Sequence, residues 1–344
     1  MVLAVLGTPS ALTYWVEHCV RAICVVLGDV YFVRADSLDT LRKYWAERGE
    51  RSVVLISDLP KVDVVDLLIK ANIPLLIVME NPRDVVGYVM KQRNMDAASA
   101  IRVATQSLCL LSEATRSTQS LVIGSSFHSL PIHDAICKLI AAMQLPIPED
   151  QFDEIAKHIC VRIGMNDQST VFSDLLRLFP ASQRPGDYEK AWPAAESALI
   201  KGIVDQYSDL VKRKQITKIS WAREAFANWD RSGEYLIGPI SLVGPRRFII
   251  WGPYLHLPRG SWEALIEIEV AENFTGNILH ADIAMGGQVI AGIEADLPQQ
   301  GCFEFSIEFT CVDPYLPTEV RFELLEGAIE GQLLLRSVRF TKKR

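Results

Sequence analysis

Hydrophobic residues in the first half of the chain form short continuous runs, separated by segments with a different pattern. The runs are rich in Val, Ile and Leu, a composition typical of parallel strands that are covered on both faces. We expect five such strands, at 2–6, 30–33, 53–57, 75–79 and 121–123. The intervening segments 37–48 and 132–143 carry apolar residues at helical spacing. Alternating strands and helices predict an α/β domain with a parallel sheet.

The second half follows a different period. From about residue 235 apolar and polar residues alternate, as in the segments 263–270, 303–310 and 320–324. This alternation is typical of half-buried antiparallel strands, and the intervening Gly and Pro residues supply turns. Residues 149–214 are expected to be helical. We therefore predict an α/β domain with a helical C-terminal part at 1–215 and a jelly-roll-like β-sandwich at 216–344.

Composition narrows the class of protein. Of the 344 residues, 49% are hydrophobic and 22% are charged, which excludes a disordered chain. No apolar run reaches the roughly 18 to 20 residues of a membrane-spanning helix, and the first residues lack the basic flank of a signal peptide. The net charge is −7 and neither half has a basic excess, which argues against a nucleic-acid partner. Seven cysteines without metal-type spacing suit a reducing compartment, so we expect a cytoplasmic protein without a metal.

Two strand-to-helix turns carry the clearest motifs. Residues 2–15 read VLAVLGTPSALTYW, where a phosphate-binding loop would lie, and residues 78–88 read VMENPRDVVGY, with a proline opening the second helix. Together they resemble the sulfotransferase family, whose first loop typically reads Pro-Lys/Arg-Ser-Gly-Thr-Thr-Trp and whose second region reads Arg-Asn-Pro-Arg-Asp-Val-x-x-Ser. The resemblance covers roughly residues 1–165 and implies a P-loop-type α/β fold with a nucleotide donor.

Most residues that would bind the donor are replaced. Leu12 stands where the family has the glycine that lets a phosphate approach the backbone closely. Glu80 stands where the family has a nucleotide-binding arginine, and its charge would repel a 3′-phosphate. Asp58 takes the place of the general-base histidine; the alternative is a turn or helix-cap residue. The positions that still match, and that would line a surviving donor site, are Gly7, Thr8, Thr13 and Arg83.

The start of the alternating region holds the second group of candidates. Residues 251–262 read WGPYLHLPRGSW and resemble the opening hairpin of carbohydrate-binding jelly-roll modules. A sugar platform needs an exposed aromatic ring flanked by planar polar groups. Trp251, Tyr254 and His256 lie close enough in sequence to supply one, although Trp251 and Tyr254 have hairpin or core packing as an alternative. Trp262 has the parity of the buried positions in its strand and is expected in the core.

Three hypotheses follow. The first is a non-catalytic, sulfotransferase-like pseudoenzyme without a cofactor: its first domain is a scaffold, and its sandwich binds a glycan or a protein, in the setting of bacterial polysaccharide assembly. The second is a transferase with another donor, with Asp58 as base and Thr13 and Arg83 at the donor. The third is a structural protein that forms homo-oligomers through the sandwich. A turn after Gly7 that side chains close is expected under the first hypothesis, and an open cradle of N–H groups under the second.

Overall fold

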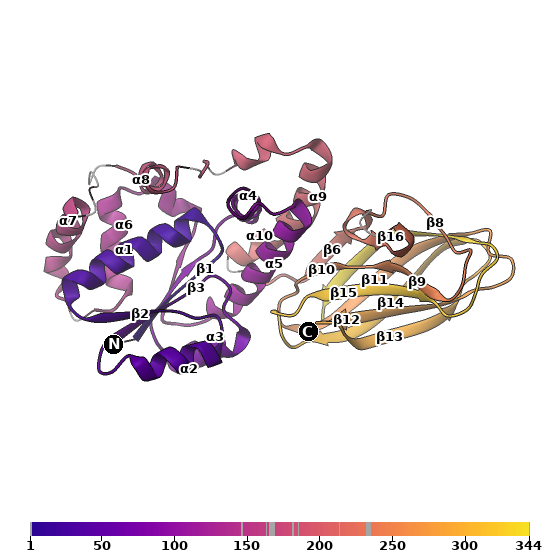
Figure 1. Ribbon diagram of the computed structural model, residues 1–344, viewed down its shortest axis with the longest axis horizontal. Helices are drawn as coiled ribbons and strands as arrows, with labels where there is room; N and C mark the ends of the chain where they lie inside the picture. Colours follow the sequence, from indigo (N-terminus) through magenta and orange to yellow (C-terminus); the bar gives the residue numbers. More distant parts are fainter. Residues whose placement is uncertain are drawn as a thin grey trace. The chain divides into compact units, whose positions relative to one another are not determined.

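The computed structural model divides into two compact units (Figure 1). One comprises Met1–Trp192 with Leu210–Arg213, and the other comprises Pro193–Asp209 with Lys214–Arg344. The expected boundary at residue 215 remains a prediction about independently folding domains. The residues that the structure describes are 2–145, 147–162, 164, 169–180, 182–184, 186–212, 214–231 and 235–343.

A parallel five-stranded sheet in the order β2-β3-β1-β4-β5 forms the centre of the first unit. Its neighbouring strands pair in parallel, and β1, β3 and β4 are almost fully buried, because helices cover both faces. This arrangement confirms the predicted α/β class. The strands are β1 (Val2–Gly7), β2 (Val30–Arg34), β3 (Ser52–Ser57), β4 (Leu75–Val78) and β5 (Ser120–Ile123).

The helices of this unit follow their sequence signals. Ser10 caps α1 by accepting a hydrogen bond from the Thr13 N–H, and α4 begins at Pro82 behind the cap residue Asn81. In Figure 1, α1 and α6 lie on one side of the sheet and α2, α3 and α5 on the other. The helices are α1 (Ala11–Leu27), α2 (Leu38–Glu47), α3 (Val62–Lys70), α4 (Pro82–Arg93), α5 (Ala97–Ala114), α6 (Ile132–Ala142), α7 (Phe152–Arg162) and α8 (Val171–Leu178).

Short helices complete the helical part of the chain. Single turns of 3₁₀-helix follow several strands and helices. Within the described ranges, no helix combines the length and hydrophobicity that crossing a membrane would require. The remaining helices are η1 (Ser125–Ser129), η2 (Glu149–Gln151), η3 (Tyr188–Ala191), α9 (Ala194–Val204), η4 (Asp205–Tyr207), α10 (Ser208–Val211), η5 (Arg223–Ala225) and η6 (Trp229–Arg231).

The second unit contains two antiparallel sheets, as the alternating pattern predicts. One has the order β13-β12-β15-β9-β7 with β10 paired to β15, and the other has the order β14-β11-β16-β6 with β8 paired to β16. Trp262 is fully buried, as its parity predicted. The strands are β6 (Lys218–Ala222), β7 (Ala227–Asn228), β8 (Ile240–Ser241), β9 (Arg247–Trp251), β10 (Pro253–Leu255), β11 (Gly260–Ala271), β12 (Ile278–Met285), β13 (Gln288–Asp296), β14 (Gly301–Cys311), β15 (Thr318–Leu324) and β16 (Gln332–Lys342).

Candidate functional site

The connections of the parallel sheet diverge at its centre. From β1 the chain runs to β2 on one side, whereas from the adjacent β4 it runs to β5 on the other. Open α/β sheets bind ligands outside the carboxyl ends of their strands at such a switch point. The segments that follow β1, β4 and β5 carry Thr8, Glu80 and His128. We call the space that they border the crevice.

The loop after β1 is closed by its own side chains. The Thr13 hydroxyl donates to the Thr8 carbonyl at 2.6 Å, and the Ser10 hydroxyl accepts from the Thr13 N–H at 3.2 Å. A Cβ added at Gly7 would clash with the Thr13 side chain, so this glycine permits close packing. Leu12 is fully buried in the hydrophobic core. Thr8 and Thr13, two of the residues expected to line a nucleotide-donor site, are therefore hydrogen-bonded to each other.

Asp58 lies in a network of cations and a phenol. Its Oδ2 accepts from Arg93 Nη2 at 2.9 Å and from the Tyr14 hydroxyl at 3.1 Å, and its Oδ1 lies 3.9 Å from Arg34 Nη1. Burial, with the neighbouring Asp58 charge, raises the pKa of Tyr14, so Tyr14 stays a protonated donor at neutral pH. These contacts place Asp58 at the centre of an ion-pair network.

Arg83 and Asp84, at the start of α4, bind a segment near the end of the first unit. Arg83 Nη1 donates to Glu189 Oε1 at 2.9 Å, and Asp84 Oδ1 accepts from the Gly186 N–H at 2.7 Å. The Arg83 backbone N–H donates to the cap residue Asn81. Arg83 is the one basic residue among the positions that match the sulfotransferase pattern. It is thus paired with the Glu189 carboxylate.

Glu80 and His128 form a buried pair in the crevice. His128 Nε2 lies 3.1 Å from each Glu80 carboxylate oxygen. Burial lowers the pKa of His128, but the hydrogen bond and charge of Glu80 outweigh it, so the pKa is raised. Burial also raises the pKa of the neighbouring Asp84 to about 6, and Glu80 adds to that rise. Sequence analysis missed His128, although its place after β5, as Glu80 follows β4, was a usable signal.

The crevice encloses very little space. Its cavity measures about 20 Å³, enough for about one water molecule. Ligand pockets typically measure roughly 300 to 1,000 Å³. A nucleotide does not fit this cavity. The side chains around it include Ser10, Glu80, Asp84, Tyr88, His128, Phe172 and Tyr188.

Aromatic rings gather on the second unit around β9. Trp229 lies in η6 and is 48% exposed, and its ring centroid is 5.5 Å from Phe248 and 6.2 Å from Trp251, both in β9. Tyr254 in β10 meets Trp251 edge-on at 5.5 Å. Tyr254 has a φ of 65°, which costs a non-glycine residue about 1 to 2 kcal/mol. We call these four residues the aromatic cluster.

A planar ion pair borders the aromatic cluster. Arg321 lies over the Phe248 ring at 5.4 Å and donates two hydrogen bonds to Asp282, at 2.8 and 3.0 Å. By contrast, His256 is buried, and its Nδ1 lies 2.9 Å from the Pro314 carbonyl oxygen. The structure therefore brings Trp251 and Tyr254 together but leaves His256 out. Sequence analysis missed Trp229, Phe248 and Arg321 because separate segments contribute them.

Comparisons with known proteins give only distant structural likenesses. No protein-family model matches the chain, and no curated protein matches its sequence. Mouse sulfotransferase SULT7A1 complexed with PAP is similar with a TM-score of 0.39 at 10% identity, over 61% of this chain and 87% of that one. The CBM36-1 domain of a xylanase from the hindgut metagenome of Trinervitermes trinervoides has a TM-score of 0.26 at 9% identity, over 37% and 98%.

A third solved structure is similar to a smaller part of this chain. The carbohydrate-binding module CBM6cm-2 from Cellvibrio mixtus lichenase 5A, in complex with cellotriose, has a TM-score of 0.20 at 19% identity, over 28% of this chain and 72% of that one. With TM-scores this low, the architecture rests on the sheet orders and registers described above. Nothing about activity follows from these likenesses.

Proposed function

We propose that the first unit is a non-catalytic, sulfotransferase-like scaffold and that the second unit binds a neutral glycan through the aromatic cluster. The contrast between the two regions carries the proposal. The crevice holds about 20 Å³ and is bordered by the carboxylates of Glu80 and Asp84. The aromatic cluster, in contrast, leaves the Trp229 ring half exposed, and its Phe248 ring lies under Arg321 of the ion pair.

The charges around the crevice support the scaffold role. A nucleotide with several phosphate charges would have to lie against the carboxylates of Glu80 and Asp84. Like charges in contact repel one another. Arg83, which could have compensated, is paired with Glu189 at 2.9 Å. The hydroxyl of Thr13 is used by the Thr8 carbonyl. Binding a donor would therefore require breaking several contacts that hold the loop closed.

The geometry of the aromatic cluster supports sugar binding. A pyranose presents an apolar face that stacks on an exposed aromatic ring, and its hydroxyls suit planar, forked donors such as Arg321. Because Asp282 already neutralises Arg321, the surface favours an uncharged ligand. We expect a millimolar-to-micromolar affinity, about 4 to 8 kcal/mol, with little dependence on salt.

The test is a titration of the full chain with neutral oligosaccharides, using cellotriose and xylohexaose as probes. Trp229→Ala and Tyr254→Ala should weaken binding at least tenfold. Phe274→Ala is the matched control, because Phe274 is an exposed aromatic residue of the same unit outside the aromatic cluster. If neither probe binds, or if all three variants bind alike, the aromatic cluster is not a glycan site.

One observation favours a second candidate function, self-association through the sandwich. Strand β13 lies at the end of its sheet and exposes Val289, Ile290 and Ile293. Exposed apolar edge strands are templates for pairing with another chain. Sedimentation of the full chain tests this candidate: Ile290→Lys should shift an oligomer to a monomer, and a native protein that is monomeric at high concentration would exclude it.

A further inference from the structure

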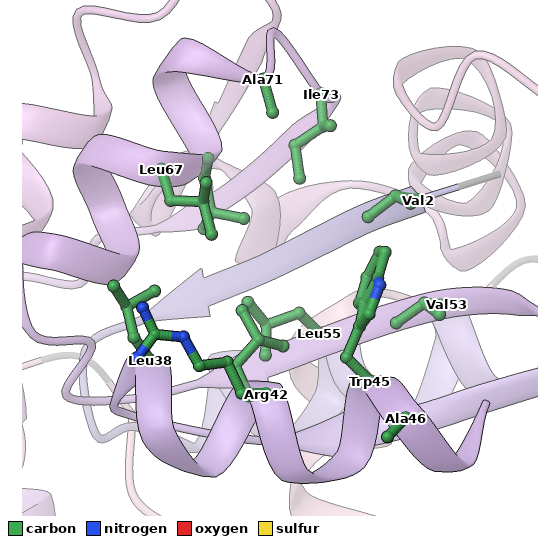
Figure 2. Close-up of a pocket in the computed structure, with 12 residues that line it drawn as sticks. Val2, Leu38, Arg42, Trp45, Ala46, Val53, Leu55, Leu67, Ala71 and Ile73 are labelled. Carbon is green, nitrogen blue, oxygen red and sulfur yellow. The ribbon is translucent and has the colours of Figure 1, made fainter.

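A second cavity in the first unit lies away from the crevice (Figure 2). It measures about 570 Å³, within the range of pockets that bind small ligands. Helices α2 and α3 form its walls, and β1 and β3 form its floor. Val2 opens β1, and Val53 lies near the start of β3. The cavity therefore lies toward the end of the sheet opposite the crevice. We call it the α2–α3 pocket.

The accessible surface of the α2–α3 pocket comes from its helices rather than from the sheet. Val53 and Leu55 on its floor are each only 1% exposed, whereas Trp45 and Leu67 at its rim are 37% and 43% exposed. The floor is therefore sealed, and a ligand in the pocket would contact the side chains of α2 and α3. The cavity between these two helices is large enough for a slender apolar chain, and its volume favours a small ligand over a docked protein.

One end of the pocket carries a positive charge. Arg42 is the one charged residue among those lining the pocket, and Figure 2 shows its guanidinium and the Trp45 ring toward opposite ends. Its side chain is 74% exposed and lies 3.3 Å from Asp39, which is itself 93% exposed. Exposed ion pairs of this kind contribute little, so an incoming anion can take the place of Asp39.

We propose that the α2–α3 pocket binds an unbranched acyl chain with an anionic head, a medium-chain fatty carboxylate. The tail lies between Trp45 on α2 and Leu67 on α3, and the carboxylate meets Arg42. This site is independent of the proposed glycan site, which lies on the other unit. Each methylene group removed from water should strengthen binding roughly fourfold. Affinity should therefore rise steeply from octanoate to dodecanoate.

The experiment is a calorimetric titration of the full chain with octanoate, decanoate and dodecanoate, each below its micelle-forming concentration. Ala46→Trp adds bulk at the exposed rim and should weaken dodecanoate binding at least tenfold, whereas Arg42→Ala should weaken it roughly threefold. Lys43 follows Arg42 on α2, is exposed and does not line the pocket. Lys43→Trp and Lys43→Ala are therefore the matched controls for bulk and for charge.

Five results would overturn the proposal. One is the absence of saturable dodecanoate binding, and another is an affinity that does not rise with chain length, a test that needs only the native chain. The third is equal binding of dodecanoate by Ala46→Trp and Lys43→Trp. If dodecyltrimethylammonium binds as tightly as dodecanoate, the anionic head is refuted. If Ala46→Trp converts a dimer to a monomer without changing dodecanoate binding, the pocket is occupied by a second copy of the chain.

Discussion

The crevice of the first unit and the aromatic cluster of the second differ in what they leave exposed. In the crevice, Glu80 binds His128 and Arg83 binds Glu189, so the functional-looking groups satisfy one another. In the aromatic cluster, the Trp229 ring stays half exposed, although Arg321 and Asp282 pair with each other next to Phe248. Under the proposed function, a motif serves folding without contacting a ligand, while a binding surface forms from segments that carry no motif.

The positions near the crevice that match the sulfotransferase pattern contribute to the fold. Asn81 and Pro82 start α4, and Gly7 allows the Thr13 side chain to pack closely. The positions that differ are those that would touch an anion: Leu12 is in the core and Glu80 is an acid. The proposed scaffold role requires only the first group.

The largest effect should come from the first turn of α1. Leu12→Ala removes a fully buried side chain, and we expect it to destabilise the first unit by about 2 to 5 kcal/mol. The measurement is urea unfolding of the full chain. Leu67→Ala, at an exposed position of the same unit, is the control and should change stability much less. If Leu12→Ala and Leu67→Ala change the free energy of unfolding by equal, small amounts, the first turn of α1 is not part of the core.

A buried carboxylate of the crevice should give the next largest effect. Burial raises the pKa of Asp84 from 3.8 to about 6, so its ionisation opposes folding, and this loss of stability develops as pH rises from about 4 to 6. Asp84→Asn, which can keep the bond from Gly186, should therefore stabilise the unit by about 2 to 3 kcal/mol at pH 7. Below pH 4 the gain should vanish, as thermal unfolding across pH can check. Asp39→Asn, at a position that is 93% exposed, is the matched control.

The Glu80–His128 pair contains a base rather than an acid, but its contribution to stability also falls as pH rises. Because the pKa of His128 is raised, its contribution to stability is present below pH 6.5 and is lost as pH rises through the folded value. Glu80→Gln removes the charge that holds the proton, so the pKa of His128 should fall. An NMR titration of the imidazole protons measures it. A pKa that does not move would show that Glu80 does not hold the histidine in solution.

The smallest effect on stability should come from the aromatic cluster. Trp229→Ala removes a half-exposed ring, and we expect a change within about 0.5 kcal/mol. The same urea experiment that reports on Leu12 measures it. A loss of several kcal/mol would mean that the ring is a packing element, and the contrast between the two regions would disappear.

The sequence predicted what depends on local periodicity. All five parallel strands were placed within one residue of their observed ends, and the alternation around Trp262 gave its burial correctly. Contacts between distant segments were not predictable in this way. His128 meets Glu80 across 48 positions, and Trp229 meets Trp251 across 22. Strand β6 was missed because five residues beside a helical region carry too short an alternation.

The most direct test of the central claim is a calorimetric titration of the full chain with adenosine 3′,5′-bisphosphate. The crevice of about 20 Å³, bordered by Glu80 and Asp84, leads us to expect no saturable heat at millimolar nucleotide. Saturable binding at micromolar concentrations would contradict the account. It would mean that the loop opens and that Thr13 and Arg83 bind a donor, as expected of a transferase with Asp58 as its base.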